Sequence, residues 1–293
     1  GLRLSGKINE NTRIGLLNVL TDQDINNEIA QNNNTLLTFR NKVSKGSNFS
    51  FFFLNRESIK EYSFSINKEK YNRVIGGEYN LASGDGKWFG KVFLHKSFRP
   101  AKTDNNKSIS SGFKITRNTK KNLIMFYSAY VGDNFRSDLG YYRRYGMYKF
   151  EPNYRFRIYP NNPKIHEIEF SHYAAWVFRT NLDNKYEGNI HYSQIQLKYL
   201  NTSRLSLQRR QTKTYLYNDF DPTRSSDSTP LPKNNFYDYV DYIFSYKSSS
   251  RNIFNIDSSI SYGSFFNGEK FSFYNELAFR RQPIFNTSIK LNF

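Results

Sequence analysis

Apolar and polar residues alternate along most of the chain. The last stretch is the clearest case: one parity holds Phe285, Ile289, Leu291 and Phe293, and the other holds Asn286, Ser288, Lys290 and Asn292. A period of two places successive side chains on opposite faces of an extended strand. Because the same alternation recurs at 88–99, 240–247, 254–262 and 271–280, the pattern predicts β-strands with one apolar and one polar face.

Turn signals of two kinds separate these segments. Compact signals are Asn9-Glu10-Asn11, Lys45-Gly46-Ser47, Gly84-Asp85-Gly86, Asn118-Thr119-Lys120, Asn201-Thr202-Ser203 and Asn267-Gly268-Glu269. Longer polar stretches occupy 22–33, 57–70, 100–108, 132–140 and 218–234. In the first half short and long connections alternate strictly, which favours an up-and-down antiparallel meander over a Greek-key sandwich. We predict an all-β fold and a single domain over residues 1–293, a closed antiparallel barrel of about 16 strands (roughly 14 to 18).

The strand count has a topological consequence. If the long connections are extracellular, a sixteen-stranded chain ends on the outside, whereas the last strand of outer-membrane barrels normally ends in the periplasm. We therefore expect one miscounted segment, near Pro152 (141–159) or near Pro283 (269–293). We also expect further strands before Gly1, so that the barrel is incomplete at its N-terminal side.

Composition first suggests a nucleic-acid partner. The 293 residues include 43 Lys+Arg and 25 Asp+Glu, a net charge of +18, and 18% are aromatic. The cations are, however, dispersed along strands without a recognition helix, so we expect no nucleic-acid partner. No apolar run approaches the roughly 20 residues of a spanning helix.

A transmembrane β-barrel accounts for the same numbers. One parity of each strand then faces lipid and the other a polar lumen, which suits a mean hydropathy of −0.74. The 23 Tyr and 27 Phe suit interfacial aromatic girdles, with Tyr141 and Tyr142 as examples. The alternating end with Phe285, Ile289, Leu291 and Phe293 is similar to the C-terminal signal read by the outer-membrane assembly machinery. We predict a bacterial outer-membrane location, with lipid, lipopolysaccharide and other outer-membrane proteins as partners.

Candidate chemistry is limited to basic side chains. They are expected either to line the lumen and favour anionic solutes or to lie at the rim and pair with lipopolysaccharide phosphates: Lys91, His95, Arg99, Arg143, Arg144, Arg209 and Arg210. The chain has no Cys, which excludes thiolate metal sites and Cys nucleophiles. The four histidines lack metal-site spacing, Asp219, Asp221 and Asp227 lack a calcium-loop pattern, and no Gly-x-Ser-x-Gly elbow occurs. We expect no catalytic residue, metal or cofactor, and no enzymatic activity.

Several segments resemble the barrel region of a Bacteroidota outer-membrane family, domain of unknown function 5916. They are Leu4-Ser5-Gly6-Lys7, Ile14-Gly15-Leu16-Leu17-Asn18, 71–81, Lys87-Trp88, 90–93, Asp138-Leu139-Gly140, and Tyr159-Pro160-Asn161-Asn162 before His166. The resemblance implies a barrel that usually follows a carbohydrate-binding-like module, and we expect that module to be absent from this chain.

Three functions stay open at this stage. The first is a pore, or a membrane anchor for a carbohydrate-binding module. The second is a structural subunit of a larger outer-membrane transport or secretion machine. The third, outside membranes, is a soluble basic β protein that binds polyanions.

Overall fold

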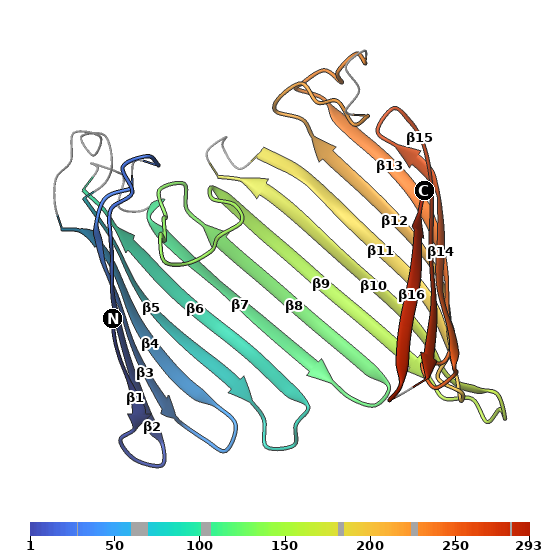
Figure 1. Cartoon of the computed structure of the whole chain (residues 1–293), viewed down its shortest axis with the longest axis horizontal. Coiled ribbons are helices and arrows are strands. Elements are labelled where there is room, and N and C mark those ends of the chain that lie inside the picture. Colours follow the sequence, from blue (N-terminus) through green and yellow to red (C-terminus); the bar gives the residue numbers. More distant parts are fainter. Residues whose placement is uncertain (28, 60–69, 101–106, 181–184, 224–227, 282) are drawn as a thin grey trace. The chain divides into compact units, whose positions relative to one another are not determined.

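The computed structural model describes the whole chain except residues 28, 60–69, 101–106, 181–184, 224–227 and 282 (Figure 1). The described residues form sixteen strands and no helix. The strands are β1 (Leu2–Lys7), β2 (Thr12–Thr21), β3 (Asn32–Lys42), β4 (Asn48–Ser58), β5 (Tyr71–Ala82), β6 (Trp88–Phe98), β7 (Ile109–Asn118), β8 (Asn122–Val131), β9 (Met147–Ile158), β10 (Ile165–Arg179), β11 (Lys185–Tyr199), β12 (Arg204–Tyr215), β13 (Phe236–Lys247), β14 (Phe254–Phe265), β15 (Gly268–Arg281) and β16 (Phe285–Asn292).

The strands form one sheet in which their order is the chain order, β1 to β16. The predicted all-β, up-and-down antiparallel fold is therefore confirmed. Among the described residues no ladder joins β1 to β16, so each of these two strands has one unpaired edge. The chain divides into two compact units: unit 1 (1–118, 125–150, 178–185) and unit 2 (119–124, 151–177, 186–293). That the chain is one domain stays a prediction.

The expectation of a miscounted segment was wrong. Pro152 lies inside β9, which runs unbroken from Met147 to Ile158, and Pro283 lies in the connection between β15 and β16. Proline fixes φ in a range compatible with extended backbone and removes one donor, so it need not divide a strand. Four of the six predicted compact turns lie between strands, whereas Asn118 is the last residue of β7, and Gly268 and Glu269 begin β15. The predicted stretches 57–70, 100–108 and 218–234 include residues outside the described part of the chain.

One face of unit 1 is apolar and exposed. Cross-strand partners on this face include Leu37, Phe53 and Ile75 in one row. The next row holds Phe39, Phe51, Gly77 and Leu94. Leu94 is 58% exposed and Phe51 50%, although both lie within paired strands. Large apolar side chains of this face are therefore left substantially exposed by the described residues of unit 1.

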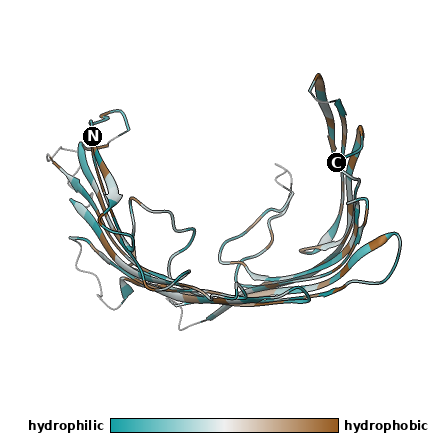
Figure 2. Ribbon diagram, turned by 90° about the horizontal axis from the view of Figure 1, so that it is seen from below, coloured by the Kyte–Doolittle hydropathy of each residue, from teal (hydrophilic) through white to brown (hydrophobic). Residues whose placement is uncertain are grey.

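Unit 2 repeats the segregation. Its apolar face has rows Phe244–Ile260–Phe273 and Ile256–Leu277–Ile289, while the opposite face carries the row Lys247–Asp257–Glu276–Lys290. In Figure 2 hydrophobic and hydrophilic segments alternate along the strands. Ile289 and Leu291 of the predicted assembly signal lie in the apolar band, and Phe285 and Phe293 are also exposed.

Little of the described chain is a buried apolar core. The fully buried hydrophobic side chains are Val74, Ala129, Val131, Phe135, Ala174, Ala175 and Leu231. Among the described residues, no helix has the length and apolar character needed to span a membrane.

Candidate functional site

The polar face of unit 1 has an apolar row that a strand connection covers. Leu36, Leu54 and Val74 are cross-strand partners on this face. The connection 132–146, which joins β8 to β9, places Phe135 against Val74, and Phe135 is 0% exposed. Burial of a Phe side chain stabilises by roughly 1.5–3 kcal/mol, enough to hold a connection on a sheet face.

Polar contacts fix the same connection at its backbone. The backbone N–H of Arg136 donates to Ser97 Oγ at 3.1 Å, and Asn72 Nδ2 donates to the Arg136 carbonyl oxygen at 3.1 Å. The N–H of Asp138 donates to Asn72 Oδ1 at 3.0 Å, and its carboxylate pairs with Arg56 Nε at 2.6 Å. Residues of β4, β5 and β6 thus hold one segment that starts more than thirty residues further along the chain.

A charged network lies beside the anchored segment. Glu78 Oε1 is 2.9 Å from Lys91 Nζ and 3.2 Å from His95 Nε2. The other ring nitrogen of His95, Nδ1, is 2.9 Å from the hydroxyl oxygen of Tyr142 in the connection. Burial raises the pKa of the Tyr142 phenol, so this residue stays neutral and able to donate.

Aromatic rings enclose the histidine of this network. The Phe52 and Phe93 ring centroids are each 4.9 Å from that of His95. Gly76, directly opposite both Phe52 and His95 in the ladders, leaves the room that these rings occupy. A Cβ at Gly76 would lie 2.3 Å from Phe52 Cζ and 2.6 Å from His95 Cδ2.

The structure places two predicted basic residues, Lys91 and His95, within this network. Arg143 and Arg144 are exposed on the connection that carries Tyr142, and Arg99 directly follows β6. That these residues act on anions stays a prediction.

The remaining two, Arg209 and Arg210, belong to unit 2 and lie on opposite faces of β12. Arg210 forms a two-point pair with Asp241, with Nε–Oδ1 at 2.7 Å and Nη2–Oδ2 at 2.5 Å. Arg209 is the cross-strand partner of Tyr242 and lines a hollow of about 350 Å³ together with Leu207. Adjacent positions on a strand cannot line one surface, so these two arginines are not brought together.

The histidines and aspartates make separate local contacts. His172 and His191 have ring centroids 5.7 Å apart, while His166 packs against Tyr159. Asp219 accepts from the Lys233 N–H, Asp221 accepts from Thr223, and Asp227 is outside the described residues. Within the described part of the chain, no three His, Asp or Glu side chains gather as a metal site would require.

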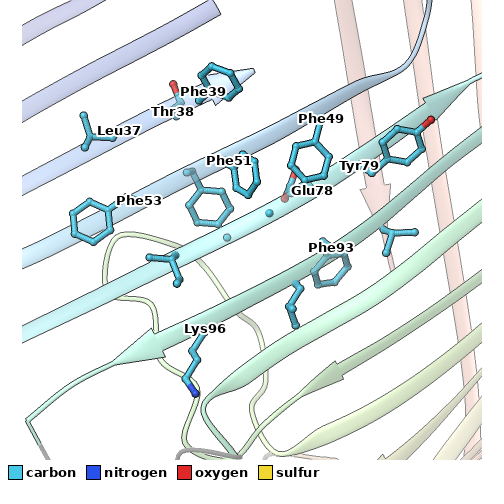
Figure 3. Close-up of a pocket in the computed structure, with 16 residues that line it drawn as sticks. Leu37, Thr38, Phe39, Phe49, Phe51, Phe53, Glu78, Tyr79, Phe93 and Lys96 are labelled. Atoms are coloured by element: carbon cyan, nitrogen blue, oxygen red, sulfur yellow. The ribbon is translucent and has the colours of Figure 1, made fainter. Parts of the chain in front are cut away.

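The apolar face of unit 1 contains a hollow of about 800 Å³. Phenylalanine rings of β4 border it, and the glycines of β5 form its floor, since Gly77 carries no side chain on this face (Figure 3). Its lining includes Leu37, Phe39, Phe49, Phe51, Phe53, Ile75, Tyr79, Val92 and Leu94. Lys96 is the cation on its border, and Thr38 and Glu78 also contribute atoms.

The sequence did not predict which residues of the connection 132–146 contact the sheet. Tyr141 and Tyr142 were both expected in an aromatic girdle. Tyr141 is 89% exposed, as a girdle residue would be, whereas Tyr142 contacts Phe135 and His95. The available signal was the unusual aromatic content of a polar connection, with Phe135, Tyr142 and Tyr145 among its residues.

Comparisons with known proteins leave the family undecided. No family model, curated protein or solved structure matches the chain. The resemblance to the Bacteroidota barrel family stays a prediction.

Proposed function

We propose that the chain is a bacterial outer-membrane β-barrel that acts as a pore. One observation carries the proposal: the register aligns large apolar side chains on one face of successive strands and leaves them exposed. On the β13–β16 ladders this face includes Phe244, Ile260, Ile256, Leu277 and Ile289.

Lipid is the cover that fits such a face. Exposed apolar patches on soluble monomers rarely exceed a few hundred Å². In unit 1 the apolar row Leu4–Leu16–Leu37–Phe53–Ile75 runs over five adjacent strands. Hydrocarbon suits such a surface better than water does. The edges of β1 and β16 that the described residues leave unpaired favour a closed barrel, because closure of a sheet removes its open edges.

The opposite face suits a water-filled lumen. Several of its charges form ion pairs, as in Arg210–Asp241, Lys247–Asp257 and Lys91–Glu78. The connection 132–146, held on this face by Phe135, would narrow the lumen and determine which solutes pass. We propose no catalytic role for any residue.

The same connection favours the second candidate, a structural subunit of a larger outer-membrane assembly with a plugged lumen. Its fixed position is what a plug requires. The resemblance to the Bacteroidota family supports a further role within membranes, as an anchor for a carbohydrate-binding module.

Single-cysteine labelling tests the lipid-facing parity, since the chain has no cysteine of its own. Val92→Cys and Leu94→Cys on β6 would each carry an environment-sensitive fluorophore in vesicles, with Phe93→Cys as the matched control on the other face. We expect the first two labels to respond to a lipid-borne quencher and the Phe93 label to respond to an aqueous one. Equal quenching at all three positions, or a chain that stays folded and monodisperse in buffer without detergent, would refute membrane insertion.

Planar-bilayer recording separates the pore from the plugged subunit. A pore gives discrete conductance steps, and a plugged subunit gives a closed trace at all voltages. Deleting part of 132–146 serves as the control, because removal of a plug should open the trace.

A further inference from the structure

A cluster of cations that form no ion pair with a described residue lies at the turn end of β1, β2 and β3. Arg40 Nε donates a hydrogen bond to Ser50 Oγ at 3.4 Å. Lys7 is the cross-strand partner of Arg13, and Arg13 is the partner of Arg40, so three cations stand side by side on three adjacent strands. Lys42 lies on the same face as Arg40, two residues further along β3. Like charges directly opposite on neighbouring strands are destabilising unless something neutralises them.

These residues line a pocket that is open to solvent, and all five of its cations are exposed. Residues of two hairpin turns, 8–11 and 43–47, contribute to its lining, and its volume is about 260 Å³. The lining is Lys7, Glu10, Asn11, Thr12, Arg13, Arg40, Lys42, Lys45, Gly46, Ser47 and Asn48. Five of the eleven are basic and one is acidic.

The backbone around the pocket is held in place. Asn9 Oδ1 accepts from the N–H groups of Asn11 and Thr12 at 2.9 and 2.8 Å. The N–H of Lys42 donates to the Asn11 carbonyl oxygen at 2.8 Å, which ties the first turn to β3. The cations are thus presented from a fixed frame, which lowers the entropic cost of binding a ligand.

No carboxylate of the described residues forms an ion pair with any of the five cations. The acid nearest in the ladders, Glu78, faces Ser50 and is already engaged by Lys91 and His95. Cations also face one another elsewhere in the sheet, as in the row Lys198–Arg204–Lys247 and the pair Lys91–Lys114. In those places Lys247 forms an ion pair with Asp257, and Lys91 forms one with Glu78. The row Lys7–Arg13–Arg40 differs because none of its three cations forms an ion pair with a described residue.

We propose that this pocket binds a phosphate monoester group. The guanidinium groups of Arg13 and Arg40 match phosphate oxygens in pairs, and Lys7, Lys42 and Lys45 supply further charge. The group comes either from a soluble phosphate or from a lipid headgroup, and the chemistry of recognition is the same. Binding does not require the pore proposed above, because every residue involved lies on the β1–β4 hairpins.

The test measures the thermal midpoint of the purified full chain in detergent micelles and its affinity for inorganic phosphate by calorimetry. We expect phosphate to raise the midpoint of the natural sequence. Arg13→Gln/Arg40→Gln should weaken affinity at least about tenfold and abolish the phosphate-dependent rise. The same variant should have a higher midpoint than the natural sequence without phosphate, since it relieves the repulsion; that gain shows that it folds.

Arg280→Gln/Arg281→Gln is the matched control, because it removes two positive charges at exposed positions of β15 that do not line the pocket. It should keep the phosphate response. Mixed micelles with phosphatidic acid form the second arm: a response to both ligands supports a soluble phosphate group, and a response to phosphatidic acid alone supports a lipid headgroup. No response to either, or equal responses from the natural sequence and Arg13→Gln/Arg40→Gln, would overturn the proposal.

Discussion

Gly76 and Gly77 are adjacent glycines of β5 that lie on opposite faces, and alanine substitution at each tests the described network. Gly76 faces Phe52 and His95, and an added Cβ would lie 2.3 Å from Phe52 Cζ and 2.6 Å from His95 Cδ2. Gly77 faces the apolar hollow, and its Cβ would lie 3.4 Å from Phe51 Cε1, at the edge of ordinary van der Waals contact. Adding one carbon should therefore destabilise the fold at Gly76, whereas at Gly77 it should be neutral or stabilising.

The expected loss in the free energy of unfolding of Gly76→Ala follows from the neighbouring side chains that must move. The Phe52 ring packs into the cluster around Val74, and His95 is held by Glu78 and Tyr142, so neither ring yields freely. Overpacking of this kind costs about 1–3 kcal/mol. Gly77→Ala removes backbone freedom from the unfolded chain without a clash, which should be neutral or stabilise by up to about 1 kcal/mol.

Urea unfolding in detergent micelles, followed by tryptophan fluorescence, measures both changes. Displacement of His95 should also weaken its 2.9 Å contact with Tyr142 and loosen the connection 132–146. Trypsin should then cleave faster at Arg143 or Arg144 in Gly76→Ala than in Gly77→Ala. If both variants lose the same stability, or if Gly76→Ala leaves cleavage unchanged, the assignment of the two faces is refuted.

Three further changes test other contacts. Arg210→Met should cost about 2–3 kcal/mol, because Asp241 stays buried without its partner, and Arg210→Met/Asp241→Leu should recover much of the loss in urea unfolding. The Asp85 carboxylate accepts hydrogen bonds from Ser83 and from the Lys87 N–H, which lower its pKa to about 2 from 3.8. Its stabilisation is therefore present above about pH 4 and lost as the pH falls towards 2, so Asp85→Asn should be less stable than the natural sequence at pH 6 and equal to it near pH 2. Phe135→Ala should cost about 3–5 kcal/mol and speed tryptic cleavage of the connection 132–146; unchanged cleavage would show that Phe135 does not hold it.

Strand parity could be predicted from the sequence because it depends only on neighbouring residues. Val92, Leu94 and Phe98 were assigned to the face opposite His95, and the structure agrees. The strand number also followed, since each connection has local turn residues. The expected miscount came from a rule about where such chains end, and no residue near Pro152 or Pro283 supported it.

Register and long-range contacts could not be predicted in this way. Which cation faces which carboxylate depends on pairing across strands, so Arg210 could not be matched with Asp241, thirty-one residues away. Packing of Phe135 on Val74 depends on an apolar row that appears only once β3, β4 and β5 are aligned. The basic residues selected from the sequence therefore included Lys91 and Arg210, which form ion pairs, and did not include Lys7, Arg13 and Arg40.

The net charge of +18 is distributed unevenly on the sheet, and this unevenness separates structural from binding roles. Where a cation has a carboxylate across the strand, as Lys247 has Asp257, the pair satisfies both groups and leaves little attraction for a solute. Lys7, Arg13 and Arg40 follow one another across three strands without such a partner, so their mutual repulsion is a standing cost that an anion would relieve. Replacing one of them by a neutral residue would lower this repulsion. A binding role for the row gives a physical reason for the presence of all three cations.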